Sequence, residues 1–571
     1  MTNNTSSIKY YDTVATMRSD STLSFGNFVK THGYHDITDG GGNLYKITNE
    51  NVFASIKLDN GLYAAPKVSG QRVNVRAFGA EGTGYGKPRV NDTEAFNLAF
   101  NYAASNGLSV YIPSGKYYIT PIQINDIDSM VVEGDGQYLS QIGAHDDASN
   151  SNSPLLKFLP KDNYAGAAIS GFSMRNLRIF ANRTNYISHD EVFKGTFVEI
   201  SSLWDKCRFQ EVFFDGCHGS ALRILKRDSS QTQSYNILEG VLIDHCAFLG
   251  TDKKAYPYTS APLLDFPDGG LEVNIRDNKF YIQQEANDSL DMSSLEAYEA
   301  YNSRSAINMA GNTQGWEING NHFIPGMNCA VIRIHNGQMH RIYGNSFERF
   351  GQYNEVLTED DKKNIGLIVW DSIVARDQIT GGLIENNRMV YPIVLEKKYR
   401  IRADHINIRE FAVEAKEVDL SGARTCFCEF TKDVQRELLD SESERNTVVN
   451  HSGSISQFSN KVGLTRRDDT GSNQENESYP TLQFDYGVDA EGKRKIKAFI
   501  RQDEYGKRLT IATKEPEKEE QRAVLFSQGC TILPQYYDTE GVSLNGALRY
   551  VDGQLLFRTN NEWKVVNLTE L

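Results

Sequence analysis

Short segments in which two apolar residues flank one residue that is usually polar recur through the middle of the chain. This alternation is typical of a half-buried β-strand, with the flanking residues facing inward and the central one outward. The segments are Leu156–Phe158, Val198–Ile200, Leu222–Ile224, Leu264–Phe266, Ile307–Met309, Ile332–Ile334 and Ile368–Trp370. They recur every 24 to 43 residues, and the shortest interval is the length of one bare solenoid coil. The pattern therefore predicts stacked coils that carry loops of different lengths.

A second repeated element follows each of these strands and has the form Ile-x-x-Asn-x-Phe. Its later copies form a column of Asn278, Asn321, Asn345 and Asn387, and a column of Phe is formed by Phe214, Phe248, Phe280, Phe323 and Phe347. Stacked Asn side chains can bond to one another along an axis, and stacked Phe can fill an interior. We assign both columns a structural role and predict seven or more coils of a parallel β-helix over residues 120–420. A large β-sandwich is the alternative, but it needs evenly spaced hairpins, which are scarce here.

The segment before the coils predicts a helix that covers the first rung of the sheet. Asn91 and Glu94 are spaced as a capping box, and Gly107 stands where the helix should end. The expected apolar stripe of this helix is Ala95, Leu98, Ala99, Tyr102 and Ala103. Strands are expected at 73–75, 109–112 and 116–119, on either side of the helix. An open first rung exposes unpaired backbone groups, so we expect the helix to protect that edge.

This opening segment also resembles a known family. Between residues 73 and 115 it contains VNV, FGAEG, NDTEAF and VYIPSG, in the order found where pectate-lyase-type right-handed parallel β-helices begin. Residues 8–70 resemble the N-terminal segments of phage tailspikes, and the last stretch resembles the C-terminal tips of phage fibres. The resemblance implies an all-β, right-handed, single-stranded parallel β-helix in a homotrimer that attaches to a phage tail or baseplate through its N-terminus.

We predict three regions on this basis. Residues 1–70 would form an N-terminal capping module for attachment to the virion, and residues 71–425 the β-helix with its capping helix. Residues 426–571 would form a β-rich region for trimerisation or glycan binding, because 479–526 reads as hairpins and two further turns occur at Asp552-Gly553 and Asn560-Asn561.

Composition narrows the classes of partner. The net charge of −14 argues against nucleic acid, which needs clustered Lys and Arg. No stretch reaches the roughly 18 apolar residues of a membrane span, and the N-terminus lacks the pattern of a signal peptide. We therefore expect a protein made in the cytoplasm, and the resemblance to phage tailspikes implies that it becomes a virion component in its host. The seven Cys have no metal-binding spacing and are interpreted as reduced, and no metal or cofactor is predicted.

The outward positions of the first strands form a ladder on which chemistry can be sought. In order they are Lys157, Glu199, Arg223, Asp265, Asn308, Arg333 and Val369. Glu199 and Asp265 are two coils apart, roughly 9 to 10 Å between Cα atoms, which suits the paired carboxyls of an inverting glycosidase. We predict these two as catalytic, with Arg223 and the nearby Asp268 binding substrate. The alternative is a structural salt-bridge ladder, which opposite charges on neighbouring coils favour by themselves.

A second candidate cluster lies further along the same face. His335 and Asp371 would be one coil apart and could share a proton, so Asp371 is a third predicted catalytic residue. The alternative is an exposed histidine that lies near a carboxylate by chance. Arg333, His335 and Asn308 are predicted to bind substrate, and Trp370 to face the core. Five Tyr on the expected loops could stack on sugar rings or form contacts within a trimer: Tyr256, Tyr258, Tyr298, Tyr301 and Tyr353.

Together these features predict a phage tailspike that recognises and depolymerises a bacterial surface polysaccharide. Capsule, O-antigen and teichoic acid are the candidate substrates. The row of Asp ligands that a pectate lyase uses for calcium is absent, which favours a hydrolase over a lyase. The alternative function is a non-catalytic receptor-binding appendage for cell-surface glycan or teichoic acid, because no complete catalytic motif is present.

Overall fold

A computed structural model gives the fold. It describes residues 8–68, 70–84, 89–149, 151–161, 168–181, 193–226, 238–250, 261–281, 304–324, 330–348, 366–371 and 381–389, and beyond 398 chiefly the backbone of the strands. Contacts divide the chain into two units, which are described separately. The first unit comprises Met1–Gln378 and Asn386–Lys398, and the second comprises Ile379–Glu385 and Tyr399–Leu571.

The N-terminal part of the first unit is a small five-stranded sheet. Its strands are β1 (Lys9–Tyr11), β2 (Phe28–Thr31), β3 (Leu44–Thr48), β4 (Ile56–Lys57) and β5 (Tyr63–Pro66), in the order β1-β2-β3-β5-β4. Helix α1 (Val14–Arg18) packs Met17 against buried Val29 and Ile47. This small apolar cluster is the core of the N-terminal sheet.

The predicted capping helix is present, but its N-terminal cap differs from the prediction. Strand β6 (Arg72–Asn74) and the 3₁₀ turn η1 (Val75–Phe78) precede helix α2 (Thr93–Asn106), which ends at Gly107 with φ 63°. The N-cap is Asp92 rather than Asn91, and the capping box with Glu94 is absent. Asp92 is turned inward instead, where its Oδ1 accepts a hydrogen bond from the backbone N–H of Glu81 at 2.7 Å.

The buried face of α2 is also rotated from the predicted stripe. Phe96 and Phe100 are fully buried, together with Ala95, Ala99 and Ala103. Leu98 and Tyr102, which the prediction placed inward, are only half-buried. Phe100 lies 6.0 Å, between ring centroids, from Phe158 of the first coils. The larger aromatic side chains therefore reach into the open end of the solenoid and fill it.

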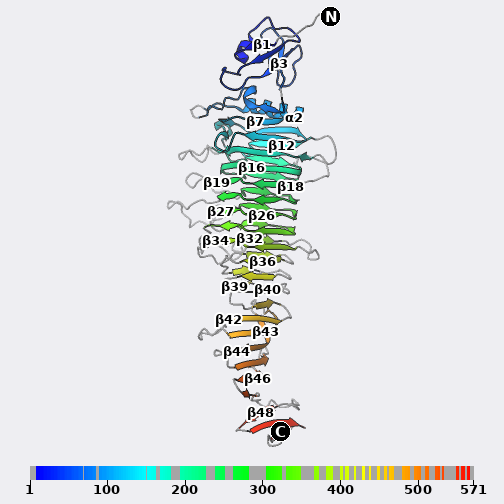
Figure 1. The fold of residues 1–571 in the computed structure, drawn as a ribbon, viewed down its shortest axis with the longest axis vertical. Coiled ribbons are helices and arrows are strands. Elements are labelled where there is room, and N and C mark those ends of the chain that lie inside the picture. The colour runs from blue at the N-terminus through cyan, green and yellow to red at the C-terminus, as the bar shows by residue number, and fades with distance from the viewer. Residues whose placement is uncertain are drawn as a thin grey trace. The chain divides into compact units, whose positions relative to one another are not determined.

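The coils are stacked as predicted, with one sheet formed by the apolar-x-apolar strands (Figure 1). In the first unit its strands are β9 (Ile122–Ile127), β12 (Leu156–Pro160), β15 (Val198–Ser201), β17 (Leu222–Leu225), β20 (Leu264–Phe266), β24 (Ile307–Met309), β28 (Ala330–Ile334) and β32 (Gly366–Asp371). Each pairs with the next in parallel. The strand positions read from the sequence are therefore confirmed, and we call this the ladder sheet.

The remaining sides of each coil belong to one large, bent parallel sheet. It begins with β7 (Ser109–Ile112), β8 (Gly115–Ile119), β10 (Val131–Gly134) and β11 (Ser140–Ala144), and the turn η2 (Asp146–Ala148) follows. Its later strands in the first unit are β13 (Ile169–Ser170), β14 (Ser173–Phe180), β16 (Leu203–Cys217), β18 (Glu239–Asp244), β19 (Ala247–Gly250), β21 (Gly269–Leu271), β22 (Asn274–Arg276), β23 (Lys279–Tyr281), β25 (Asn312–Gln314), β26 (Glu317–Asn319), β27 (His322–Ile324), β29 (Gly337–Gln338), β30 (His340–Tyr343), β31 (Ser346–Phe347) and β34 (Arg388–Met389).

The two structural columns are confirmed. Asn278, Asn321, Asn345 and Asn387 are buried, and the Nδ2 of each of the first three donates to the Oδ1 of the next at 2.9 to 3.0 Å. The Phe rings stack in pairs with centroids 4.7 to 5.1 Å apart. Cys207, Cys217 and Cys246 are buried free thiols as expected, and the side chains of the other four Cys lie outside the described residues.

The second unit contains parallel strands, followed along the chain by antiparallel sheets. The parallel strands are β33 (Gly382–Glu385), β35 (Tyr399–Arg402), β36 (Ile406–Glu410), β37 (Glu417–Asp419), β38 (Phe427–Phe430), β39 (Arg436–Leu438) and β40 (Asn446–Val449), and β41 (Ile455–Phe458) pairs antiparallel with β40. Parallel pairing thus extends past residue 425. The three proposed domain limits stay a prediction.

The C-terminal hairpins are present where they were predicted. A six-stranded antiparallel sheet contains β42 (Val462–Arg467), β43 (Tyr479–Val488), β44 (Arg494–Gln502), β45 (Arg508–Thr513), β46 (Gln521–Ser527) and β47 (Cys530–Ile532). A three-stranded antiparallel sheet contains β48 (Leu548–Val551), β49 (Gln554–Thr559) and β50 (Glu562–Val565), and the two predicted turn dipeptides lie outside the described residues.

Candidate functional site

The ladder sheet brings the predicted site residues together on successive rungs. Glu199 pairs in register with Lys157 on one side and with Arg223 on the other, and Arg223 pairs with Asp265. Asp265 is in turn opposite Asn308 on the next strand. The register read from the sequence is therefore confirmed, because two inward apolar residues fix which residue of each strand points outward.

Arg223 joins the two predicted catalytic carboxylates. Its Nη1 lies 3.9 Å from Oε2 of Glu199, and its Nε lies 3.3 Å from Oδ2 of Asp265. The guanidinium side chain is 41% exposed, whereas the two carboxylates are about one-tenth exposed. Lys157 adds a second cation 3.5 Å from Glu199. Arg223 thus bridges and partly covers both carboxylates. The exposed edge of its guanidinium group can contact a ligand.

Asp265 is more buried than an outward ladder position suggests. Its residue exposure is 7%, and this burial raises the pKa of its carboxyl above the ordinary value. The hydrogen bond from Asn308 and the charge of Arg223 lower the pKa, while the charge of Asp268 raises it further. A carboxyl whose pKa is raised holds its proton more readily, as a general acid requires.

Asp268, a predicted substrate-binding residue, contacts the backbone of the neighbouring coil. Its Oδ2 accepts a hydrogen bond from the backbone N–H of Lys226 at 3.2 Å. This bond stabilises the backbone that directly follows β17 in the neighbouring coil. Its influence on the site is electrostatic, through the pKa of Asp265. Asp268 remains exposed and near the ladder, and its contact with substrate stays a prediction.

Asn308 links Asp265 to His335. Its Nδ2 donates to Oδ1 of Asp265 at 2.9 Å, and its Oδ1 lies 3.0 Å from Nε2 of the exposed His335. Because the amide oxygen can only accept, Nε2 of His335 carries the proton in this arrangement. The three side chains therefore form one hydrogen-bonded row across three rungs.

The second predicted cluster is only partly described. Arg333 is in register between Asn308 and Val369. Val369 is 1% exposed, so it does not extend the open ladder as predicted, and Trp370 is fully buried as predicted. Asp371 ends β32, but its side chain lies outside the described residues, so its pairing with His335 stays a prediction. The five loop Tyr also lie outside the described residues.

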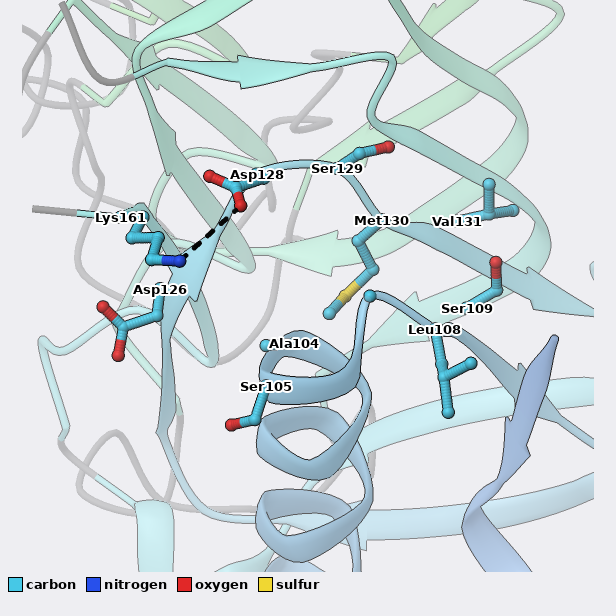
Figure 2. Close-up of a pocket in the computed structure, with 11 residues that line it drawn as sticks. Ala104, Ser105, Leu108, Ser109, Asp126, Asp128, Ser129, Met130, Val131 and Lys161 are labelled. Atoms are coloured by element: carbon cyan, nitrogen blue, oxygen red, sulfur yellow. Dashed lines mark ion pairs between the residues drawn. The ribbon is translucent and has the colours of Figure 1, made fainter. Parts of the chain in front are cut away.

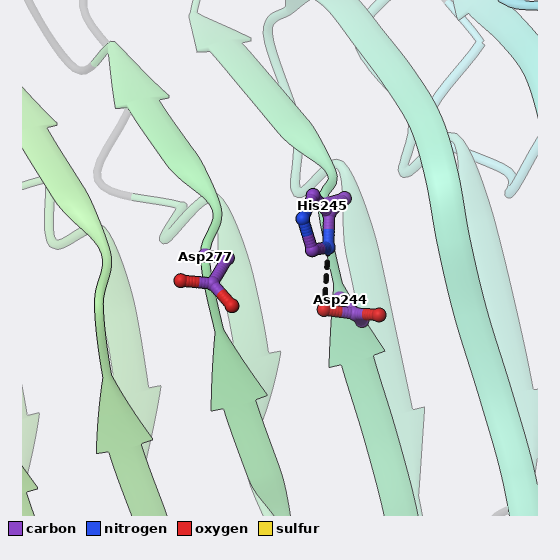
Figure 3. A group of neighbouring side chains, drawn as sticks. All are labelled: Asp244, His245 and Asp277. Carbon is purple, nitrogen blue, oxygen red and sulfur yellow. Dashed lines mark hydrogen bonds and ion pairs between the residues drawn. The ribbon is translucent and has the colours of Figure 1, made fainter.

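A group of potential metal ligands that the sequence patterns missed lies at the turn after β18 and β22 (Figure 3). Ligand atoms of Asp244, His245 and Asp277 all lie within 4.8 Å of one another. His245 and Asp277 occupy equivalent turn positions with φ 51° and 55°, a signal visible only once the coils are aligned. However, Oδ1 of the buried Asp244 already accepts from His245 Nδ1 at 2.7 Å and Arg276 Nε at 3.2 Å. These contacts satisfy the carboxylate within the protein.

Comparisons with known proteins agree with this fold. A profile of the family "Rhamnogalacturonase A/epimerase, pectate lyase-like" matches residues 72–189, which include the capping helix and the first rungs. No curated protein matches the chain. Within the described residues, no helix is long and apolar enough to cross a membrane.

Three solved structures of phage proteins are similar at low identity. ORF18 of Geobacillus virus E2 is 13% identical, with 99% of this chain and 100% of that chain covered and a TM-score of 0.42. The enzymatically active domain of tailspike protein 2 from bacteriophage CBA120 is 12% identical, with coverages of 88% and 69% and a TM-score of 0.43. Tailspike gp49 of the Acinetobacter baumannii phage Fri1, described as a capsular polysaccharide depolymerase, is 11% identical, with coverages of 91% and 95% and a TM-score of 0.40.

Proposed function

We propose that the chain is a phage tailspike that binds a bacterial surface polysaccharide on the ladder sheet and cleaves it by glycosidic hydrolysis. The observation that carries the proposal is a pair of largely buried carboxylates, Glu199 and Asp265, which lie two rungs apart and are bridged by Arg223. The class of substrate follows from the resemblance of the chain to phage tailspikes. Capsule, O-antigen and teichoic acid are the candidates.

In the proposed reaction the two carboxyls have different tasks. Asp265, whose pKa is raised by burial, protonates the leaving glycosidic oxygen as the general acid. Glu199 removes a proton from the attacking water on the opposite side of the sugar. A separation of two rungs, roughly 9 to 10 Å between Cα atoms, leaves room for that water and supports inversion of configuration.

Arg223 and the row beyond Asp265 would hold the substrate. The exposed edge of the guanidinium can donate to sugar hydroxyls or to an acidic substituent. His335 and Arg333 extend the polar surface along the next rungs, and Asp371 stands as a candidate for proton transfer with His335. A homotrimer attached to the phage tail through the N-terminal module completes the proposal.

A second candidate function is binding without cleavage. It is favoured by the way Arg223 and Asn308 already occupy the carboxylates, as in a structural salt-bridge ladder. A receptor-binding appendage of this kind would bind glycan saturably and release no product. Cleavage requires Arg223 to release the two carboxylates while it stays in contact with the substrate, whereas binding alone leaves its ion pairs in place.

The test is incubation of the full chain with capsule, O-antigen and teichoic acid prepared from candidate hosts. New reducing ends without an ultraviolet-absorbing double bond indicate hydrolysis, and new reducing ends with that double bond indicate a lyase. Loss of a general acid or base should lower turnover on the order of 10²- to 10⁴-fold in Glu199→Gln and Asp265→Asn. Glu317→Gln is the matched control, since Glu317 pairs with Arg341 on another face. If both ladder variants keep full turnover, the site assignment is wrong.

A further inference from the structure

A cavity of about 550 Å³ lies beside the C-terminal end of α2 and is unrelated to the candidate carboxylate pair (Figure 2). Its volume is within the range of small-molecule sites. Leu108, buried Met130 and Val131 give it an apolar part. Ser105 and Ser129 contribute hydroxyls, and Asp126, Asp128 and Lys161 contribute charges. An apolar surface beside several hydroxyls and carboxylates is the combination that contacts the two kinds of surface on a sugar ring.

The charges that line this cavity are out of balance. Asp126 and Asp128 both line the cavity, and the C-terminus of a helix itself carries a partial negative charge. Lys161 is the one cation in the lining, and its Nζ lies 4.0 Å from Oδ2 of Asp128, at the limit of an ion pair. Within the described residues, the Asp126 carboxylate has no hydrogen bond or ion pair. The cavity therefore favours ligands that donate hydrogen bonds or carry positive charge.

We propose that this cavity is a separate saccharide-binding site that accepts a neutral or amine-bearing sugar unit and rejects an anionic one. Carboxylates that accept hydrogen bonds from hydroxyl or ammonium groups make some of the stronger polar contacts in proteins. Leu108 contacts the apolar face of the ring. An anionic sugar, such as a uronate, is repelled by both carboxylates and by the helix terminus.

The location of the cavity fits a role apart from the candidate catalytic residues. Asp126 belongs to β9 and Lys161 directly follows β12, so the cavity lies at the ends of the first two rungs of the ladder sheet. Asp265 is on the fifth rung, which places it roughly 20 Å away along the stack. Binding at the cavity does not depend on whether the ladder cleaves glycan.

The experiment measures binding of glucosamine, glucose and glucuronate to the full chain by saturation-transfer NMR. The background protein is Glu199→Gln, so that contacts at the ladder are reduced in every sample. Glucosamine should bind best, glucose less well and glucuronate not at all. Asp126→Asn should weaken glucosamine binding roughly tenfold, which is about 1.4 kcal/mol. Ser105→Trp should block binding of both sugars by filling the cavity from an exposed position.

The matched control is Glu50→Gln, which removes one exposed carboxylate in the N-terminal sheet region and should leave binding unchanged. The proposal is overturned if none of the three sugars binds, or if Ser105→Trp binds as well as its background. It is also overturned if glucuronate binds as tightly as glucosamine. Because these readouts need no cleavage, loss of the proposed hydrolase activity would leave the result intact.

Discussion

The buried His340 should make the fold sensitive to mild acid. Its ring is fully buried between Trp316 and Trp370, with centroid distances of 6.2 and 5.2 Å. Nδ1 accepts from the backbone N–H of Trp316 at 3.2 Å, and Nε2 lies 2.9 Å from Oγ1 of Thr313. Thr313 gives its own proton to the carbonyl of Asn336, so Nε2 must donate. The neutral tautomer with its proton on Nε2 therefore satisfies the hydrogen-bonding capacity of both ring nitrogens.

Burial lowers the pKa of His340 to about 3, whereas a histidine in the unfolded chain titrates near 6.5. Below pH 6.5 the His340 side chain therefore binds a proton in the unfolded state but not in the native state. The free energy of unfolding falls as the pH decreases, at about 1.4 kcal/mol per pH unit, until the native ring also protonates. At pH 5 the loss from this one residue should be about 2 kcal/mol relative to pH 7.

The assay is denaturant unfolding of the wild type and of His340→Gln at pH 7 and pH 5, followed by tryptophan fluorescence. The variant should be less stable at pH 7 because it loses packing between the two Trp rings. Its deficit should shrink by about 2 kcal/mol at pH 5, because glutamine does not titrate. Replacement of the exposed His32 by Gln is the control. Parallel pH dependence in wild type and His340→Gln would refute the reasoning.

Two further predictions concern the coils. Asn345→Ala should lower the free energy of unfolding by about 2 to 4 kcal/mol in denaturant titration, because it removes the acceptor of the buried Asn321 backbone N–H and the side-chain donor to the Ile318 carbonyl; a loss no larger than that of the exposed-helix control Asn106→Ala would contradict it. Asp265→Asn should leave the melting temperature at neutral pH unchanged or higher, because the raised pKa means that the folded site disfavours the charged carboxylate there. A melting temperature several degrees lower would instead show that the ion pair with Arg223 stabilises the fold.

The positions of the ladder residues could be predicted from the sequence, but the burial of their side chains could not. The alternation in Val198–Ile200 and Leu264–Phe266 fixed the outward residues, and pairing of equivalent residues then followed from the fixed strand spacing. The burial of Asp265 depends on what its neighbours cover, which strand periodicity does not contain. Asn308 stood on the ladder in the sequence, but its bonds to Asp265 and His335 required side-chain directions.

Some features of the capping helix could likewise be predicted from the sequence, and others could not. Its position and its end at Gly107 followed from local backbone preferences, which act over a few residues. The choice of Phe96 and Phe100 over Leu98 and Tyr102 as its buried face was made by the shape of the open first coil. Asp92 was likewise drawn inward by the Glu81 amide, a contact between segments eleven residues apart.

By itself the sequence determined that this chain is a stack of parallel coils with a helical cap and antiparallel C-terminal hairpins, because repeated apolar positions specify strands and their facing. The tertiary structure alone decided which ladder groups are shielded, where His340 is confined and that a cavity forms between the end of α2 and the first rungs. Burial and electrostatic environment arise from segments that meet only in the folded stack.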